Sequence, residues 1–135
     1  MFDLFHIGHL NVLKRAANAC DHLIVGVTTD DFCQQSKGHK PFIEFKERLE
    51  IVANLRVVDQ AVSQSSLDKY AAWKAHRFDV MFVGDDWKGT DRWNKIEAEF
   101  AADSVSIVYF PYTKMTSSTI LRKALRSISE KGTAP

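Results

Sequence analysis

The residues most able to do chemistry are two histidines near the start of the sequence, in the segment Asp3-Leu-Phe-His6-Ile-Gly8-His9. Histidines three residues apart lie on one face of a helix, and Gly8 between them lets a ligand approach the backbone. The free N–H groups at a helix start favour an anion, and imidazoles can donate hydrogen bonds to phosphate oxygens. The pair therefore predicts a phosphate site, with half of a metal site or a structural role as the alternatives.

A second segment that could bind an anion, Thr116-Ser117-Ser118-Thr119, follows a predicted strand that ends near Pro111. Hydroxyl groups at such positions ordinarily cap a helix. However, two helices that follow two parallel strands begin at the same edge of the sheet, where ligands bind in open α/β folds. We therefore expect the histidine pair and the hydroxyl cluster to hold one polyphosphate between them.

The elements that must position these groups are short apolar runs alternating with segments of helical period. The predicted strands are residues 22–29, 80–83 and 105–110, with a weaker candidate at 59–63. Near-continuous apolar runs are typical of parallel strands covered on both faces. The predicted helices are residues 10–20, 45–56, 67–77, 93–102 and 117–128. This alternation indicates one α/β domain over residues 1–135 with a mainly parallel sheet.

Composition excludes several classes of function. Lys and Arg total 18 and Asp and Glu total 17, a net charge of +1, which does not favour binding nucleic acid or an anionic membrane through bulk charge. No apolar run approaches the ~20 residues that cross a bilayer, and Cys20 and Cys33 are too far apart for a CxxC pair. We expect a cytoplasmic protein with two reduced thiols, no nucleic-acid partner and no membrane insertion.

The start of the sequence is short for this architecture. Residues 6–10 are expected to open the first helix, so only five residues precede it, whereas a strand leading into it needs about 5–6 residues and a turn. We therefore expect a truncated first strand, and a natural protein or relatives that begin several residues earlier.

Taken in order, these segments resemble the cytidylyltransferases. FDLFHIGH resembles their HxGH motif, and residues 117–119 resemble their second motif, a Ser/Thr-rich helix start. IVGVTTDDF, KGHKPFIEFKERLEIV, VVDQ and VGDDWKG resemble, in the same order, the glycerol-3-phosphate branch of the family, and the match covers nearly all of residues 1–126. The resemblance implies a Rossmann-like, three-layer nucleotidylyltransferase domain.

The resemblance also implies a reaction and a set of roles. A phosphate oxygen of a small phosphorylated alcohol attacks the α-phosphorus of CTP, and pyrophosphate leaves, with Mg²⁺ accompanying the triphosphate and no metal held by the protein alone. By family position the catalytic residues are His6, His9 and Lys37, and acceptor-binding residues are Arg48, Trp87 and Lys40. The implied nucleotide-binding residues are Phe2, Asp3, Gly8, Arg56, Asp59, Asp85, Asp86, Thr113, Ser117, Ser118 and Thr119. Lys37 is expected on a flexible loop.

Three departures from the family pattern bear on this interpretation. Tyr112 stands where relatives have an arginine, and tyrosine lacks the permanent charge and the two-pronged phosphate grip. Met115 stands where they have a glycine, and His39 where many have a lysine. The alternatives left open are an adenylyltransferase acting on a flavin or a sugar phosphate, and a non-catalytic nucleotide-binding module. Relatives of this kind are often homodimers, which we also expect here.

Overall fold

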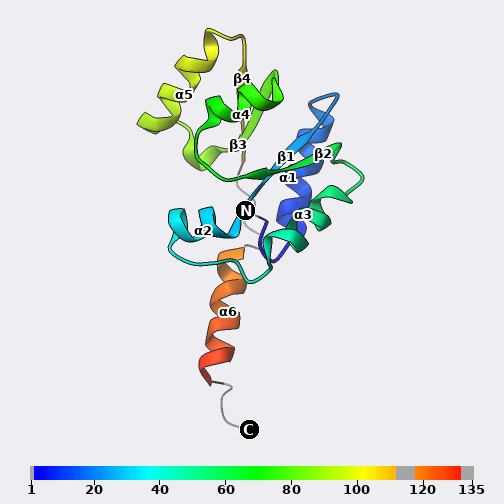
Figure 1. The fold of residues 1–135 in the computed structure, drawn as a ribbon, viewed down its shortest axis with the longest axis vertical. Helices are drawn as coiled ribbons and strands as arrows, with labels where there is room; N and C mark the ends of the chain where they lie inside the picture. Colours follow the sequence, from blue (N-terminus) through cyan, green and yellow to red (C-terminus); the bar gives the residue numbers. More distant parts are fainter. Residues whose placement is uncertain (1, 112–117, 132–135) are drawn as a thin grey trace. The chain divides into compact units, whose positions relative to one another are not determined.

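The structure, a computed structural model, describes residues 2–111 and 118–131, without the side chains of residues 86, 118–120 and 129–131. The chain divides into two compact units. The first unit comprises Met1–Ser65 and Thr113–Pro135, and the second comprises Ser66–Tyr112. Each unit contains one pair of parallel strands and its own helices (Figure 1).

The first unit is built on the parallel strands β1 (Ile24–Thr28) and β2 (Gln60–Gln64), in which Val25 lies opposite Ala61. Four helices accompany them in the described part of this unit. These are α1 (Ile7–Asn18), α2 (Asp30–Lys37), α3 (Phe45–Ala53) and α6 (Ser118–Lys131). Helix α3 packs against both strands, so its apolar side and the sheet form the centre of this unit (Figure 1).

The core of the first unit follows the apolar pattern of the sequence. Val25 and Val27 of β1 are buried, as is Val52 of α3, and Leu13 and Ala16 form the buried stripe of α1. Burial of such side chains is worth about 1.5–3 kcal/mol for a residue as large as valine or leucine. The core therefore fixes α1 and α3, which carry the predicted histidines and Arg48, relative to the sheet.

The second unit contains β3 (Val80–Gly84) and β4 (Ser106–Phe110), which are parallel, with Phe82 opposite Val108. Its helices are α4 (Lys69–His76), the short 3₁₀ helix η1 (Asp85–Trp87) and α5 (Asp91–Ala101). Helix α5 packs against β4 and buries Trp93 and Phe100. Alternating helices and parallel strands in both units confirm the predicted α/β class.

Two local predictions were wrong. Lys37 does not lie on a loop, because it is the last residue of α2, a helix that the apolar pattern did not indicate. The Thr29 hydroxyl caps this helix by accepting the Phe32 N–H at 3.3 Å, and Gly38 ends it with a φ of 76°. In addition, the helix predicted over residues 45–56 ends at Ala53, so Arg56 lies in the turn beyond α3.

Residues 2–6, ahead of α1, contain a turn and no strand. Phe2 and Leu4 have φ angles of 60° and 50°, values that L-residues adopt rarely and that must be held by surrounding contacts. The expectation that related proteins begin earlier stays a prediction. Within the described ranges, no helix is both long enough and apolar enough to cross a membrane.

Candidate functional site

The two histidines form a reciprocal cap at the start of α1. His6 is the N-cap residue, with φ −141° and ψ 179°, and its Nδ1 accepts the Gly8 N–H at 3.0 Å. His9 reaches back, and its Nδ1 accepts the His6 N–H at 3.3 Å. A neutral imidazole carries one proton, so a ring whose Nδ1 accepts must carry that proton on Nε2. Local backbone bonding therefore sets both rings to the tautomer that donates from Nε2.

The environment keeps both rings neutral. Their centroids are 3.9 Å apart and their planes meet at 25°, so the rings stack. Burial lowers the pKa of His6 below its ordinary value. Burial, followed by the neighbouring His6, lowers the pKa of His9 to about 3. Both imidazoles are consequently uncharged near neutral pH and act through their N–H groups.

The Nε2 atom of His6 is buried and has no hydrogen-bond partner among the described residues. Buried donors without a partner are uncommon in folded proteins, because each one costs about 1–3 kcal/mol of desolvation. Such a donor at the N-terminus of a helix is suited to donate a hydrogen bond to a phosphate oxygen. The structure therefore brings His6, Gly8 and His9 together, as the sequence predicted, in an arrangement that can bind a phosphate.

Asp3 connects three segments of the chain next to the His6–His9 pair. Its side chain is fully buried, and its two carboxylate oxygens accept the N–H groups of Phe42 and Ile43, each at 3.0 Å. Arg122 of α6 lies 3.4 Å from the same carboxylate. These contacts place the second turn of α6 beside the loop that precedes the histidines.

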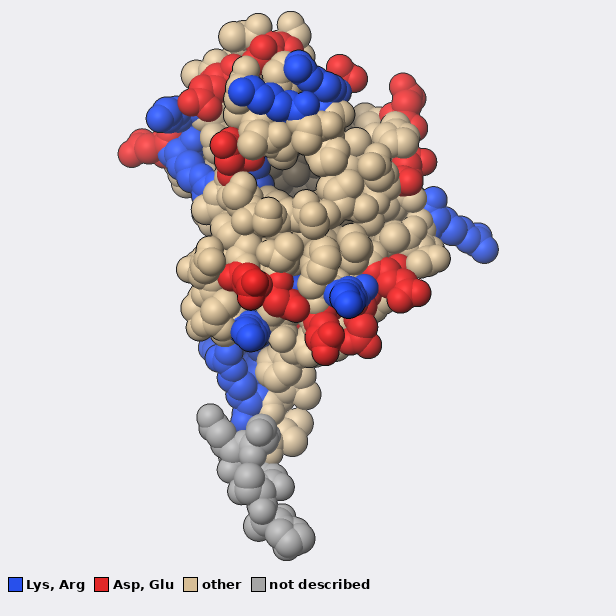
Figure 2. Space-filling view, in the orientation of Figure 1, with Lys and Arg blue, Asp and Glu red and all other residues tan. Residues whose placement is uncertain are grey.

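Arg122 was not identified from the sequence as a site residue. It is 9% exposed, whereas its neighbours Lys123 and Arg126 are exposed. Basic side chains along α6 appear in blue in Figure 2. The sequence shows only that Arg122 follows the hydroxyl cluster closely, in a helix with an apolar stripe. Its partner Asp3 is 119 residues away in the sequence, so the pairing could not be predicted.

Phe2 lies against the histidine pair. Its ring meets the His9 ring edge-on, with centroids 5.3 Å apart, and the Phe5 ring lies 5.2 Å from His9. These apolar rings contribute to the burial that keeps His9 uncharged. Phe2 thus sits next to the predicted catalytic pair, and its role as a nucleotide contact stays a prediction.

Arg48 lies inside the first unit, 1% exposed. Its Nε donates to the Ile43 carbonyl at 2.8 Å, and one terminal nitrogen bonds Asp30 at 2.7 Å. The other Asp30 oxygen accepts the Phe45 N–H at 3.1 Å, at the start of α3. Arg48 therefore joins the start of α2 to the start of α3, whereas the sequence predicted only that it binds the acceptor. Its partner Asp30 was not identified from the sequence.

The lysines around α2 are exposed to solvent. Lys37 ends the helix and Lys40 follows two residues after Gly38. The buried Cys33 thiol donates to the His39 carbonyl at 3.4 Å and so fixes the segment between the two lysines. Both ammonium groups are therefore accessible from solvent, as a role in binding phosphate requires.

Asp59 and Arg56 lie at the entry to β2. An oxygen of Asp59 accepts the Leu23 N–H at 2.7 Å, and the backbone N–H of Asp59 donates to the Leu23 carbonyl. Asp59 thereby fixes how the chain enters β1 and β2. Arg56 is exposed, and its role as a nucleotide contact stays a prediction.

The remaining predicted residues fall in three places. Asp85 and Trp87 belong to η1 of the second unit, directly after β3, and Trp87 is 49% exposed. Ser118 and Thr119 begin α6. Thr113 and Ser117 lie outside the described residues. The side chains of Asp86, Ser118 and Thr119 lie outside the described part of the structure as well.

The sequence is similar to that of known proteins over most of its length. Residues 1–124 match the family described as cytidylyltransferase-like. The chain is 33% identical over 128 residues to a glycerol-3-phosphate cytidylyltransferase of Bacillus spizizenii, covering 94% of this chain and 93% of that one. It is 26% identical over 131 residues to an FAD synthase of Thermococcus sibiricus, covering 96% and 88%.

The structure also resembles a solved one. A lipopolysaccharide core biosynthesis protein from Thermoplasma volcanium superposes with a TM-score of 0.69 at 23% identity, covering 86% of this chain and 93% of that one. At this identity the likeness concerns the fold alone. Together with the family match, it confirms the predicted Rossmann-like architecture.

Proposed function

This chain belongs to the cytidylyltransferase-like family, and on that premise we propose that it transfers CMP from CTP to glycerol 3-phosphate. The products are CDP-glycerol and pyrophosphate. The proposal draws its substrates from relatives named glycerol-3-phosphate cytidylyltransferase, with which the chain shares 33% and 31% identity over most of its length. The family match supports the enzyme class, and the histidine pair supplies the chemistry.

The observation that carries the proposal is the Nε2–H donor of His6, buried without a partner and paired with His9 at a helix start. In the reaction, an oxygen of the acceptor phosphate forms a bond to the α-phosphorus, and the bond from that phosphorus to the bridging oxygen of pyrophosphate breaks. Negative charge grows on the α-phosphate oxygens and on the leaving group. Fixed N–H donors aimed at that charge stabilise the transition state without any covalent intermediate.

Neutral imidazoles suit this task. The acceptor phosphate is already an anion, so no general base is needed to activate it, and a donor that keeps its proton is sufficient. The low pKa of His9 keeps its ring in the neutral form whose Nδ1 accepts from His6. Protonation would break that bond and release the ring.

The surrounding groups would align the substrates. Asp3, through Phe42, Ile43 and Arg122, holds the loop of the histidines against α6. The exposed Lys37 and Lys40 would approach the phosphates. We propose that Arg48, through Asp30, fixes α2 relative to α3 and so positions these lysines for the substrate phosphates. Alignment of this kind can provide several kcal/mol of barrier reduction.

We further propose that Mg²⁺ accompanies CTP. Among the described residues no group of three or more His, Cys, Asp and Glu side chains is gathered as a metal site. Mg²⁺ is commonly bound through substrate phosphates with one or two carboxylates, so the ion would be held mainly by the triphosphate, whose charge it would reduce. A cytoplasmic location and a homodimer complete the proposal.

Adenylyl transfer is the second candidate, supported by the likeness to an FAD synthase at 26% identity. The experiment that separates the two is a pyrophosphate-release screen of CTP and ATP, with Mg²⁺, against glycerol 3-phosphate, other phosphorylated alcohols, a sugar phosphate and a flavin phosphate. We expect release from CTP with glycerol 3-phosphate. Release only from ATP would contradict the proposal, and CTP binding by calorimetry without release from any pair would identify a non-catalytic module.

A further inference from the structure

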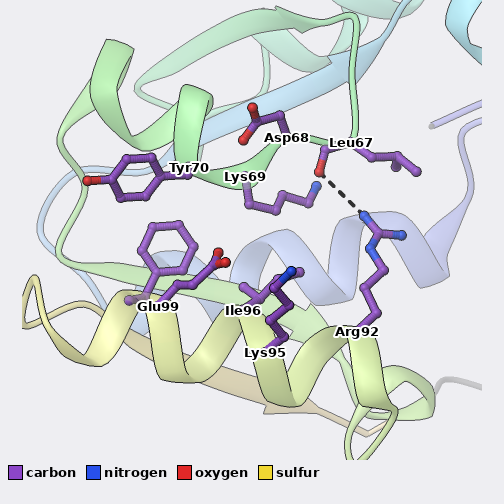
Figure 3. A pocket seen from close by; sticks show the side chains of 9 residues that line it. Leu67, Asp68, Lys69, Tyr70, Arg92, Lys95, Ile96 and Glu99 are labelled. Atoms are coloured by element: carbon purple, nitrogen blue, oxygen red, sulfur yellow. Dashed lines mark hydrogen bonds between the residues drawn. The ribbon is translucent and has the colours of Figure 1, made fainter.

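The second unit contains a cleft that none of the predicted site residues lines. It lies between α4 and α5 and has a volume of about 200 Å³ (Figure 3). This volume is below the roughly 300–1,000 Å³ of pockets that enclose drug-sized ligands, so any occupant must be smaller than a nucleotide. The residues that line it include Asp68, Lys69, Tyr70, Arg92, Glu99 and Phe100.

One end of the cleft is cationic. Lys69, the first residue of α4, is half-buried, and Arg92 lies in the first turn of α5. Figure 3 shows the two side chains approaching each other near the Leu67 carbonyl, to which Arg92 donates at 3.4 Å. Burial, together with the nearby Arg92, lowers the pKa of Lys69. Two cations held together in this way repel one another.

Carboxylates of the cleft do not neutralise these cations. The Asp68 carboxylate instead accepts the Ala71 N–H at 3.0 Å, as the cap of α4. Glu99 is exposed on α5, as is Lys95. In the part of the chain that the structure describes, neither Lys69 nor Arg92 has a carboxylate within ion-pair distance.

The other end of the cleft is apolar. The rings of Tyr70 and Phe100 have centroids 6.1 Å apart, and Phe100 is buried at 1% exposure. Tyr70 is 37% exposed and lies at the far end of the cleft from Arg92 in Figure 3. An anionic group next to a small apolar body would therefore match both ends.

We propose that this cleft binds a small organic anion, with its oxyanion between Lys69 and Arg92 and its apolar part against Tyr70 and Phe100. Hydrogen bonds from cations to an oxyanion are about twice as strong as neutral ones, and a guanidinium has five N–H donors with which to form them. The ligand supplies the counter-charge that the cleft lacks. Phosphate monoesters and carboxylates share this chemistry.

The test is a titration of the full-length protein, followed by backbone amide NMR, with phenyl phosphate, benzoate and neutral phenol as separate probes. We expect saturable shifts at Lys69, Tyr70 and Arg92 with at least one anion and a much smaller response to phenol. Phosphate and carboxylate are distinguished by which anion binds more tightly. Shifts near His9 report the proposed nucleotide site separately, so failure of either site can be recognised without the other.

Two substitutions test the contacts. Lys69→Gln and Arg92→Gln should each weaken binding about tenfold, since a hydrogen bond to a charged group contributes that much. Lys14→Gln, a neutralisation of an exposed lysine on α1, should leave the affinity unchanged. The proposal is overturned if neither anion gives saturable shifts in this cleft, if phenol binds as tightly as the anions, or if both folded glutamine variants keep wild-type affinity.

Discussion

The Nδ1 atom of His9 accepts the backbone N–H of His6 at 3.3 Å while the two imidazole rings stack with centroids 3.9 Å apart. This bond and the one from the Gly8 N–H to His6 Nδ1 cap α1, and together they assign the remaining proton of each ring to Nε2. The hydrogen bonds that cap the helix are therefore the same ones that set the tautomers of the two proposed catalytic rings. Substitutions in this pair should therefore affect turnover more than binding.

We expect His6→Ala and His9→Ala each to lower kcat by roughly 10²–10³-fold, the usual loss when one transition-state donor is removed. KM for CTP should change much less, because the donors are proposed to act most strongly on charge that develops during the reaction. Steady-state pyrophosphate release measures both constants. His22→Ala, on an exposed histidine outside the site, is the matched control and should be near wild type. Normal kcat in both folded variants would contradict the assignment.

Acid should destabilise the protein through His9. Its pKa falls from 6.5 in the unfolded chain to about 3 in the folded protein, so between these values the unfolded chain binds the proton and the folded one does not. The stability linked to this histidine is fully present above about pH 6.5 and declines as the pH falls towards 3. Lowering the pH from 7 to 5 should therefore cost wild type roughly 1–2 kcal/mol more than it costs His9→Ala.

Urea unfolding of both proteins at these two pH values measures the difference. Carboxylates with ordinary pKa values remain largely ionised at pH 5, so the comparison isolates the histidine contribution. Equal losses of unfolding free energy in wild type and His9→Ala would show that the folded His9 titrates normally.

The buried Asp3–Arg122 pair should be important for stability. Asp3→Asn keeps the size of the side chain but leaves the charge of Arg122 without its counter-charge, and breaking a buried pair typically costs about 3–5 kcal/mol. Arg122→Met should cost a similar amount, and the double variant should cost less than the sum of the two. Chemical unfolding measures all three, with Asp21→Asn as a control at an exposed carboxylate. Strictly additive losses would mean that the two side chains do not interact.

The fold was predictable where an element buries an apolar stripe. Strand β1 and helix α1 follow from Val25, Val27, Leu13 and Ala16, and all are buried as the period requires. Helix α2 escaped prediction because only Cys33 of its eight residues is buried, so no apolar period exists to detect. Its signals were instead the Thr29 cap, two acidic residues in the first turn and Gly38 at its end.

The candidate site was predictable only in part for a different reason. The histidine pair is local, and a spacing of three residues is visible in the sequence. The contacts of Asp3 with Arg122 and of Arg48 with Asp30 join residues 119 and 18 positions apart. No periodicity reports such pairings, since they depend on how the elements pack. Arg48 and Asp3 could therefore be identified from the sequence, but the residues that each one contacts could not.

The central claim is that the Nε2–H groups of His6 and His9 donate to the phosphates of CTP. Its most direct test is histidine ¹⁵N NMR of the protein labelled at its imidazoles, recorded with and without CTP and Mg²⁺. We predict that the Nε2–H signals of both rings shift downfield on binding, while the Nδ1 signals keep the positions of hydrogen-bond acceptors. Turnover of CTP by the same sample with both imidazole signals unchanged would contradict the claim.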